Sequence, residues 1–183
     1  MQRTLIAALA AALVAAAPAV ALERIYLVRH AEKEEPWPAA YADFQPLSEA
    51  GRVRALRLAE RFADAGLVAV YSSLTSRAFA TAMPIAQRAG VRVVADDATI
   101  DRRALPAFFD ALRERHRDGR AVLVVGHSNT IPWLLEALGG GDCRRRLGVG
   151  DDDRIKGYDG LWRIDLHRPG CAGIERLSQG PAD

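Results

Sequence analysis

Residues 25–32 read Ile25-Tyr26-Leu27-Val28-Arg29-His30-Ala31-Glu32, and residues 122–129 read Val122-Leu123-Val124-Val125-Gly126-His127-Ser128-Asn129. Each stretch begins with an apolar run and continues into a histidine. A continuous apolar run bounded by polar residues is typical of a strand buried on both faces, as in parallel sheets. We therefore predict two buried strands that end at His30 and His127.

Strands and helices alternate through the rest of the chain. The expected strands cover residues 25–28, 67–71, 91–95, 122–125, 161–166 and 174–177, and the expected helices cover residues 49–65, 74–88, 106–117 and 130–138. Val53, Leu56, Ala59 and Ala63 recur at helical spacing in the first helix, and Pro84 is expected to kink or split the second. This alternation predicts one three-layer α/β domain over residues 22–183. A mostly parallel central sheet would have helices on both faces.

The first 21 residues have the pattern of a cleaved export signal. Arg3 precedes an apolar run over residues 5–17, and small residues follow in Pro18-Ala19-Val20-Ala21. A membrane anchor is the alternative, but the apolar run is short for a bilayer span. Cleavage after Ala21 would leave 162 of the 183 residues. We expect a periplasmic or secreted protein with no stable membrane anchor.

Charge and cysteine content restrict the partners and the compartment. The formal net charge is +2, and Lys33 and Lys156 are the only lysines, so arginine supplies most of the positive charge. No basic run is longer than the three residues Arg144-Arg145-Arg146, and we expect no nucleic-acid partner. Cys143 and Cys171 are the only cysteines. In an exported chain they allow one disulfide, which would stabilise the fold by roughly 3–4 kcal/mol.

The two histidines are expected at one edge of the sheet. In an open α/β sheet, ligands bind just outside the carboxyl ends of the strands. Arg29 precedes His30 there, and His127 follows a neighbouring strand end. Arg77 falls in the first turn of the helix after the strand at 67–71, and so returns to the same edge. Two imidazoles with arginine predict a site for an anionic group, with phosphate as the leading candidate.

This arrangement suits phosphoryl transfer. A neutral imidazole attacks phosphorus without first losing a proton. Neighbouring arginines lower the pKa of such an imidazole, and their charge neutralises the phosphoryl oxygens. Arg29 stands next to His30 in this way, while Ser128 and Asn129 open a helix beside His127 and are further candidates for phosphate binding.

Together these motifs resemble those of the histidine phosphatase superfamily, which has the phosphoglycerate-mutase-like fold. The matching segments are Arg29-His30 with Ala31 where glycine is usual, Leu47-Ser48-Glu49-Ala50-Gly51, Arg77 with Thr81-Ala82, and Gly126-His127-Ser128. The similarity runs from about Arg24 to Gly139. Each motif alone is weak, but the combination is specific.

The resemblance implies a mechanism. His30 would attack the phosphoryl group, and water would hydrolyse the resulting phosphohistidine. Arg29, Arg77 and His127 would hold the phosphoryl oxygens. No cofactor or metal is implied, because a cationic pocket repels divalent cations and the usual ligand spacings are absent; a zinc ion on the two histidines is the alternative. The expected partner is a phosphorylated small molecule or an exposed phosphoryl group on a larger molecule.

The proton donor is the part of the family pattern without a clear match. Family enzymes usually have a carboxylic acid that protonates the leaving oxygen. One branch has a glutamate after the helix of the Arg77 type, and the other has an aspartate where this chain has Ser128. Asp101 is the best-placed candidate, and Glu32 is its rival. An enzyme for good leaving groups, such as phosphohistidine, and a catalytically weak or inactive phosphate-binding module are both open alternatives.

Overall fold

A computed structural model places most of the chain beyond the expected export signal. It describes residues 21–117, 119–141, 143, 147, 149 and 153–179. The signal expected over residues 1–21 lies outside the described residues, apart from Ala21. Within the described ranges, no helix combines the length and apolar character needed to cross a membrane.

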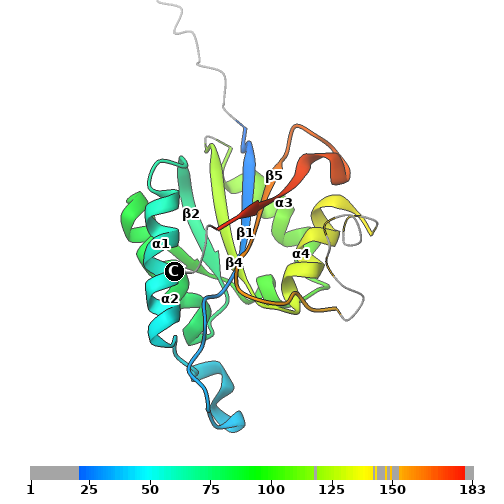
Figure 1. The fold of residues 1–183 in the computed structure, drawn as a ribbon. Helices are drawn as coiled ribbons and strands as arrows, with labels where there is room; N and C mark the ends of the chain where they lie inside the picture. The colour runs from blue at the N-terminus through cyan, green and yellow to red at the C-terminus, as the bar shows by residue number, and fades with distance from the viewer. Residues whose placement is uncertain are drawn as a thin grey trace, which may run out of the picture.

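The described chain forms a six-stranded mixed sheet (Figure 1). Its strands are β1 (Arg24–Arg29), β2 (Leu67–Ser72), β3 (Val93–Ala95), β4 (Ala121–Gly126), β5 (Gly160–Asp165) and β6 (Ile174–Ser178). Their spatial order is β3-β2-β4-β1-β5-β6. The four strands from β3 to β1 are parallel, whereas β5 is antiparallel to both of its neighbours. The predicted α/β class with a mostly parallel sheet is confirmed.

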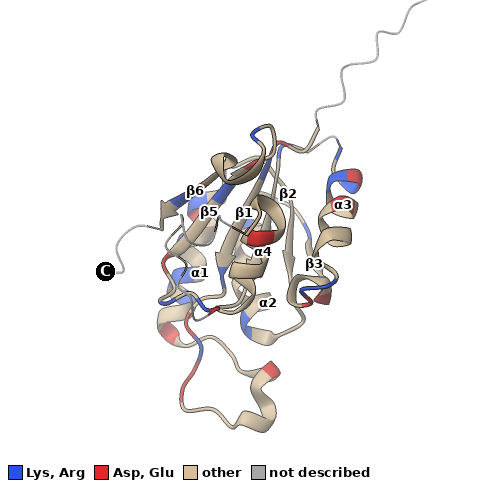
Figure 2. Ribbon diagram, turned by 90° about the vertical axis from the view of Figure 1, so that its right-hand side faces the viewer, with Lys and Arg blue, Asp and Glu red and all other residues tan. Residues whose placement is uncertain are grey.

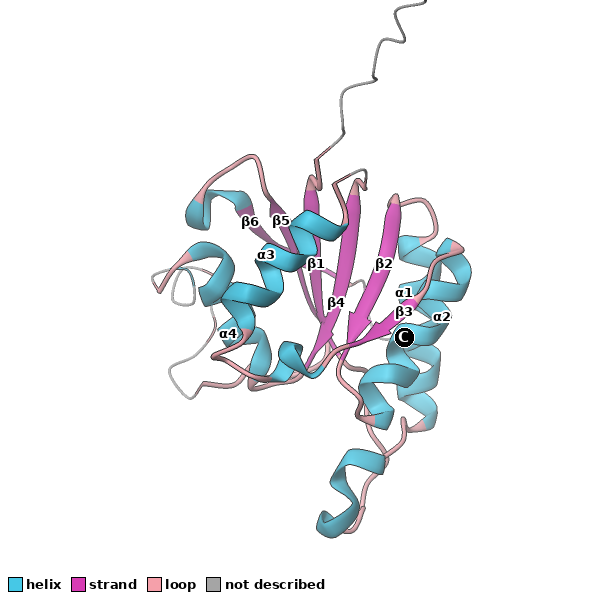
Figure 3. Cartoon of the chain, turned by 180° about the vertical axis from the view of Figure 1, so that it is seen from behind, coloured by secondary structure: helices cyan, strands magenta, loops and turns pink. Residues whose placement is uncertain are grey.

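Helices cover both faces of this sheet. They are α1 (Glu49–Phe62), α2 (Ser76–Ala89), α3 (Leu105–Arg115) and α4 (Thr130–Gly139), with short 3-10 helices η1 (Ala39–Phe44), η2 (Asp97–Ile100) and η3 (Gly170–Gly173). In Figures 1 and 3, α1 and α2 lie on one face, and α3 and α4 lie on the other. Basic and acidic residues are interspersed over both helical layers (Figure 2), in keeping with the small net charge.

Burial on both faces explains the continuous apolar run of β4. Val122 and Val124 pack into the core formed with α3 and α4, whereas Leu123 and Val125 pack into the core formed with α1 and α2. All four side chains are fully buried. Because successive residues of a strand point to opposite faces, a strand covered on both sides needs apolar residues at every position.

Two details of the helices differ from expectation. α1 buries Ala55, Leu58, Ala59 and Phe62, a stripe at helical spacing, and leaves Val53 and Leu56 exposed. The residues quoted from the sequence were therefore a poor guide to the buried face.

Pro84 does not split α2, which runs unbroken from Ser76 to Ala89. Proline removes one helical hydrogen bond, but Ile85 and Ala86 beside it are buried in the core. Tertiary packing of that apolar face explains why the helix continues.

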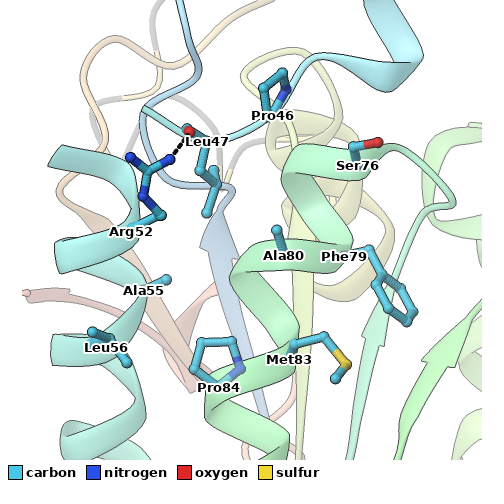
Figure 4. A pocket seen from close by; sticks show the side chains of 10 residues that line it. All are labelled: Pro46, Leu47, Arg52, Ala55, Leu56, Ser76, Phe79, Ala80, Met83 and Pro84. Carbon is cyan, nitrogen blue, oxygen red and sulfur yellow. Dashed lines mark hydrogen bonds between the residues drawn. The ribbon is translucent and has the colours of Figure 1, made fainter. Parts of the chain in front are cut away.

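An apolar groove of about 660 Å³ lies between α1 and α2 (Figure 4). The exposed side chains of Leu56 and Met83 lie along it, together with Phe79. None of the predicted site residues lines this groove. The predicted site residues lie instead at the carboxyl ends of the strands, outside this groove.

A disulfide joins Cys143 and Cys171, whose Cα atoms are 5.1 Å apart. It links the chain just after α4 to η3 in the connection between β5 and β6. The two cysteines lie 28 positions apart in the sequence. The pairing that the cysteine count allowed is present in the structure.

Candidate active site

The ends of β1 and β4 bring the two histidines together. These strands are parallel neighbours, with Arg29 opposite Gly126. The backbone N–H of His30 donates to the carbonyl of Gly126 at 2.9 Å, which continues the pairing by one residue. The ring centroids of His30 and His127 are consequently 5.1 Å apart. Parallel pairing thus places both imidazoles at one sheet edge.

His30 is held as a neutral imidazole that carries its proton on Nδ1. Its Nδ1 lies 2.7 Å from the carbonyl oxygen of Ala31, and because a carbonyl only accepts, Nδ1 carries the proton. The side chain is buried. Burial, assisted by the charges of His127, Arg29 and Arg77, lowers the pKa of His30 to about 3, although the hydrogen bond to Ala31 acts in the opposite direction. Nε2 therefore keeps a lone pair at neutral pH.

His127 is fixed from three sides. Its backbone N–H donates to Thr130 Oγ1 at 2.8 Å, so the first residue of α4 holds the turn after β4. On its ring, Nε2 lies 2.9 Å from Ser73 Oγ, and Nδ1 lies 3.4 Å from Arg77 Nη2. Burial, with the charges of Arg77 and Arg29, lowers the pKa of His127 to about 4. This ring is also neutral at pH 7.

Arg77 enters the site from the first turn of α2. Its Nη1 donates to the carbonyl of Ala42 in η1 at 2.7 Å, while Nη2 approaches His127. One turn later, Thr81 Oγ1 donates to the carbonyl of Arg77 and accepts from the backbone N–H of Ala31. Thr81 thereby ties the start of α2 to the segment after β1, next to His30.

Arg29 has partners that the sequence analysis missed. Its Nη1 donates to the carbonyl of Gly157 at 2.6 Å, and its guanidinium carbon lies 3.9 Å from the ring centroid of Tyr158. The Tyr158 ring is also 5.9 Å from that of His30. Tyr158 lies in a polar segment without periodicity, and its position before β5, at the sheet edge where β1 ends, is the only signal that could have identified it.

Comparisons with known proteins agree with this geometry. The model of the histidine phosphatase superfamily (branch 1) matches residues 25–104. A solved structure of a candidate phosphohistidine phosphatase, SixA from Agrobacterium tumefaciens, is 28% identical with a TM-score of 0.60, and the match covers 79% of this chain and 92% of that one. No curated protein matches the sequence. The resemblance to the histidine phosphatase superfamily that the sequence predicted is confirmed by this match and this structural neighbour.

More distant superfamily structures share the fold. A mycobacterial glucosyl-3-phosphoglycerate phosphatase is 17% identical with a TM-score of 0.63, and the match covers 85% of this chain and 97% of that one. The protein histidine phosphatase SixA in complex with tungstate is 14% identical, with the same TM-score and the same coverage. At these identities the likeness concerns the fold alone.

The close approach of Gly51 to Glu32 explains the Leu-Ser-Glu-Ala-Gly motif of this chain. A Cβ atom at Gly51 would overlap the carbonyl oxygen of Glu32. Ser48 caps α1 by accepting from the N–H of Gly51, and its own N–H donates to the same Glu32 carbonyl at 3.0 Å. The motif therefore lets α1 approach the segment that follows His30.

Neither candidate proton donor, Glu32 or Asp101, is hydrogen-bonded to His30 or His127 within the described part of the chain. Glu32 is bound by Arg54, whose Nε and Nη2 donate to its carboxylate at 2.6–2.9 Å. Burial alone would raise the pKa of Glu32, but the hydrogen bonds and charge of Arg54 outweigh it and hold this pKa below its ordinary value. Asp101 is exposed and accepts from the backbone N–H of Arg103 at 2.9 Å.

The remaining predicted residues lie beside the cluster. Ser128 and Asn129 are half-buried between His127 and α4, and the carbonyl of Ser128 accepts from Ile155 N–H at 2.8 Å. Among the described residues their side chains form no hydrogen bond with the histidines, so phosphate binding by them stays a prediction. His116 follows α3 and is half-buried, with its Nε2 2.7 Å from the hydroxyl of Tyr71.

Proposed function

We propose that this protein is a metal-independent phosphatase that transfers a phosphoryl group to His30 and then to water. The observation that carries the proposal is the protonation of His30. Its Nδ1–H is committed to the Ala31 carbonyl, and its lowered pKa leaves Nε2 unprotonated. A buried imidazole in this state, with Arg29 and Arg77 within electrostatic reach, is suited to attack an anionic phosphoryl group.

The reaction would take two displacements. In the first, the Nε2 lone pair of His30 bonds to phosphorus, and the bond to the leaving group breaks with its electron pair on the leaving atom. Arg29 and Arg77 neutralise the charge spread over the phosphoryl oxygens, while the neutral His127 ring lies beside the reacting group. In the second, water attacks phosphorus, the P–N bond breaks back to His30, and the proton from water passes to solvent. Inorganic phosphate is released.

The state of the carboxylates favours good leaving groups. Glu32 is held as an anion by Arg54, and Asp101 caps a turn at the surface. Because neither Glu32 nor Asp101 is placed as a proton donor to the two histidines within the described residues, a substrate whose leaving atom departs easily should react best. A phosphoryl group on nitrogen, as in phosphohistidine, meets this requirement. The similar Agrobacterium tumefaciens structure is described as that of a candidate phosphohistidine phosphatase, which supports the same class of substrate for this chain.

We also propose that the protein is exported. The amino-terminal sequence has the pattern of a cleaved signal, with a mature domain over residues 22–183. The Cys143–Cys171 disulfide supports this location, because disulfides persist in oxidising compartments such as the periplasm.

The test is a quench experiment on the purified mature protein. Wild type, His30→Ala and the control His167→Ala, which changes an exposed histidine, are incubated with a ³²P-labelled phosphoryl donor and a chelator. We expect acid-labile, base-stable label on wild type and His167→Ala, and none on His30→Ala. A protein that binds phosphate, yet forms no label and releases no phosphate from any donor, would be a binding module instead.

A further inference from the structure

Arg29 is oriented without losing its charge. Its Nη1 binds a carbonyl, that of Gly157, and its flat face lies against the ring of Tyr158. Among the described residues Arg29 has no carboxylate within ion-pair distance, and its Nε is buried without a hydrogen-bond partner. A carboxylate partner would neutralise the guanidinium, whereas an aromatic face and a carbonyl hold it and leave its full positive charge available.

The same ring reaches the nucleophile. The centroid of Tyr158 lies 5.9 Å from that of His30, at an interplanar angle of 61°. Arg29 and His30 are consecutive, so their side chains leave the chain in different directions at the end of β1. A side chain that touches both can fix their relative position, and Tyr158 is placed to do so.

The segment that carries Tyr158 is anchored at both ends. On one side Ile155 is buried, and its N–H donates to the carbonyl of Ser128, directly after His127. On the other side β5 begins at Gly160, whose carbonyl accepts from Gln179 Nε2 at 2.9 Å. The position of the ring is therefore set by β4 and by the edge of the sheet.

We propose that Tyr158 is a positioning residue, whose ring holds the Arg29 guanidinium beside His30 in the orientation that binds a phosphoryl group. The inference rests on the proposed function, since it gives Arg29 the role of binding phosphoryl oxygens. The ring performs this role, because the Tyr158 hydroxyl has no hydrogen-bond partner within the described residues. Tyr158→Phe should therefore preserve phosphate binding, whereas Tyr158→Leu should weaken it.

The test is a double-mutant cycle on phosphate binding, measured by isothermal titration calorimetry with inorganic phosphate. The proteins are wild type, Tyr158→Leu, Arg29→Met and the double variant, with Tyr158→Phe as the conservative control. A cation–π contact of this kind corresponds to an affinity change of about three- to thirtyfold. We expect Tyr158→Leu to weaken phosphate binding by that factor and Tyr158→Phe to stay within about twofold of wild type. In the Arg29→Met background, Tyr158→Leu should have no further effect.

Two results would overturn the proposal. Equal losses in Tyr158→Leu with and without Arg29 would show that Tyr158 does not act through the guanidinium. A loss in Tyr158→Phe as large as in Tyr158→Leu would assign the effect to the hydroxyl. Circular dichroism and thermal unfolding of each variant identify any that fails to fold, and Tyr158→Phe then still decides between ring and hydroxyl. If wild type binds phosphate but hydrolyses no donor, the proposed hydrolysis fails while the cycle still tests Tyr158.

Discussion

Ser73 Oγ lies 2.9 Å from Nε2 of His127, although 54 positions separate the two residues in the sequence. The other ring nitrogen, Nδ1, approaches Arg77 Nη2, and a guanidinium can only donate. Nδ1 is therefore the acceptor, and Nε2 carries the proton that is donated to Ser73. A buried serine directly after β2 thus selects the tautomer of His127.

Replacing Ser73 by alanine should lower kcat/KM by about fivefold, because one hydrogen bond of about 1 kcal/mol orients the His127 ring and its loss frees both ring and tautomer. The measurement is kcat/KM for an aryl phosphate. Ser72→Ala is the matched control, since Ser72 is equally buried but donates to the carbonyl of Ser73 instead of to a histidine. Similar losses in the two variants would mean that packing, and not the contact with His127, is responsible.

The two buried histidines should make stability depend on pH. The folded-state pKa values of His30 and His127 are about 3 and about 4, below the ordinary 6.5. Between those values and pH 6.5 the unfolded chain binds more protons than the folded one, so stability is complete above pH 6.5 and falls as the pH drops toward 4. At pH 5 each histidine should lower the free energy of unfolding by about 2 kcal/mol.

Urea unfolding at pH 7 and pH 5 measures this effect. His30→Asn and His127→Asn should each reduce the difference between the two pH values, whereas His167→Asn, at an exposed position, should leave it unchanged. An unaltered difference in the first two variants would show that neither ring is held neutral.

The sequence was most informative where the chain is covered on both faces. Continuous apolar runs identified β1 and β4, and the histidines that follow them meet because parallel strands end at one edge. Arg77 was found for the same reason, since it opens the helix after β2. These predictions depend only on local pattern and on the rules of α/β topology.

Features that depend on contacts between residues far apart in the sequence could not be predicted from local patterns. Tyr158 meets Arg29 across 129 positions in a segment with no periodicity, so no local pattern marks it. Likewise, the choice of buried face in α1 is decided by packing on α2 and the sheet, and Val53 and Leu56 were apolar without being buried. The pairing of Glu32 with Arg54 also joins residues that lie 22 positions apart, and no local pattern marks it.

The disulfide should contribute measurably to stability. Closing a loop of 28 residues by the Cys143–Cys171 bond should stabilise the fold by roughly 3–4 kcal/mol in the chain-entropy model. The double variant Cys143→Ser/Cys171→Ser should therefore unfold at lower urea concentration than wild type. Thiol titration of the unfolded, unreduced wild type should find no free thiol, and two free thiols would contradict the bond.

The last prediction concerns Glu32, which the structure ties to Arg54 with side-chain exposures of 23% and 15%. Glu32→Gln should lower the free energy of unfolding by about 1–3 kcal/mol, because charge-assisted hydrogen bonds to a half-buried arginine are lost. Glu49→Gln is the control, since its pair with Arg52 is exposed and should contribute little.

Activity separates this structural role from acid catalysis. A carboxylate held as an anion cannot donate a proton, so Glu32→Gln should leave the ratio of kcat/KM between aryl and alkyl phosphates unchanged. A general acid matters most for alkyl phosphates, whose leaving oxygen is strongly basic. If Glu32→Gln slowed only the alkyl substrates, Glu32 would be the proton donor, and the preference for good leaving groups proposed above would be wrong. Measuring the same ratio of kcat/KM between aryl and alkyl phosphates in Glu49→Gln shows whether the loss of any surface charge has this effect.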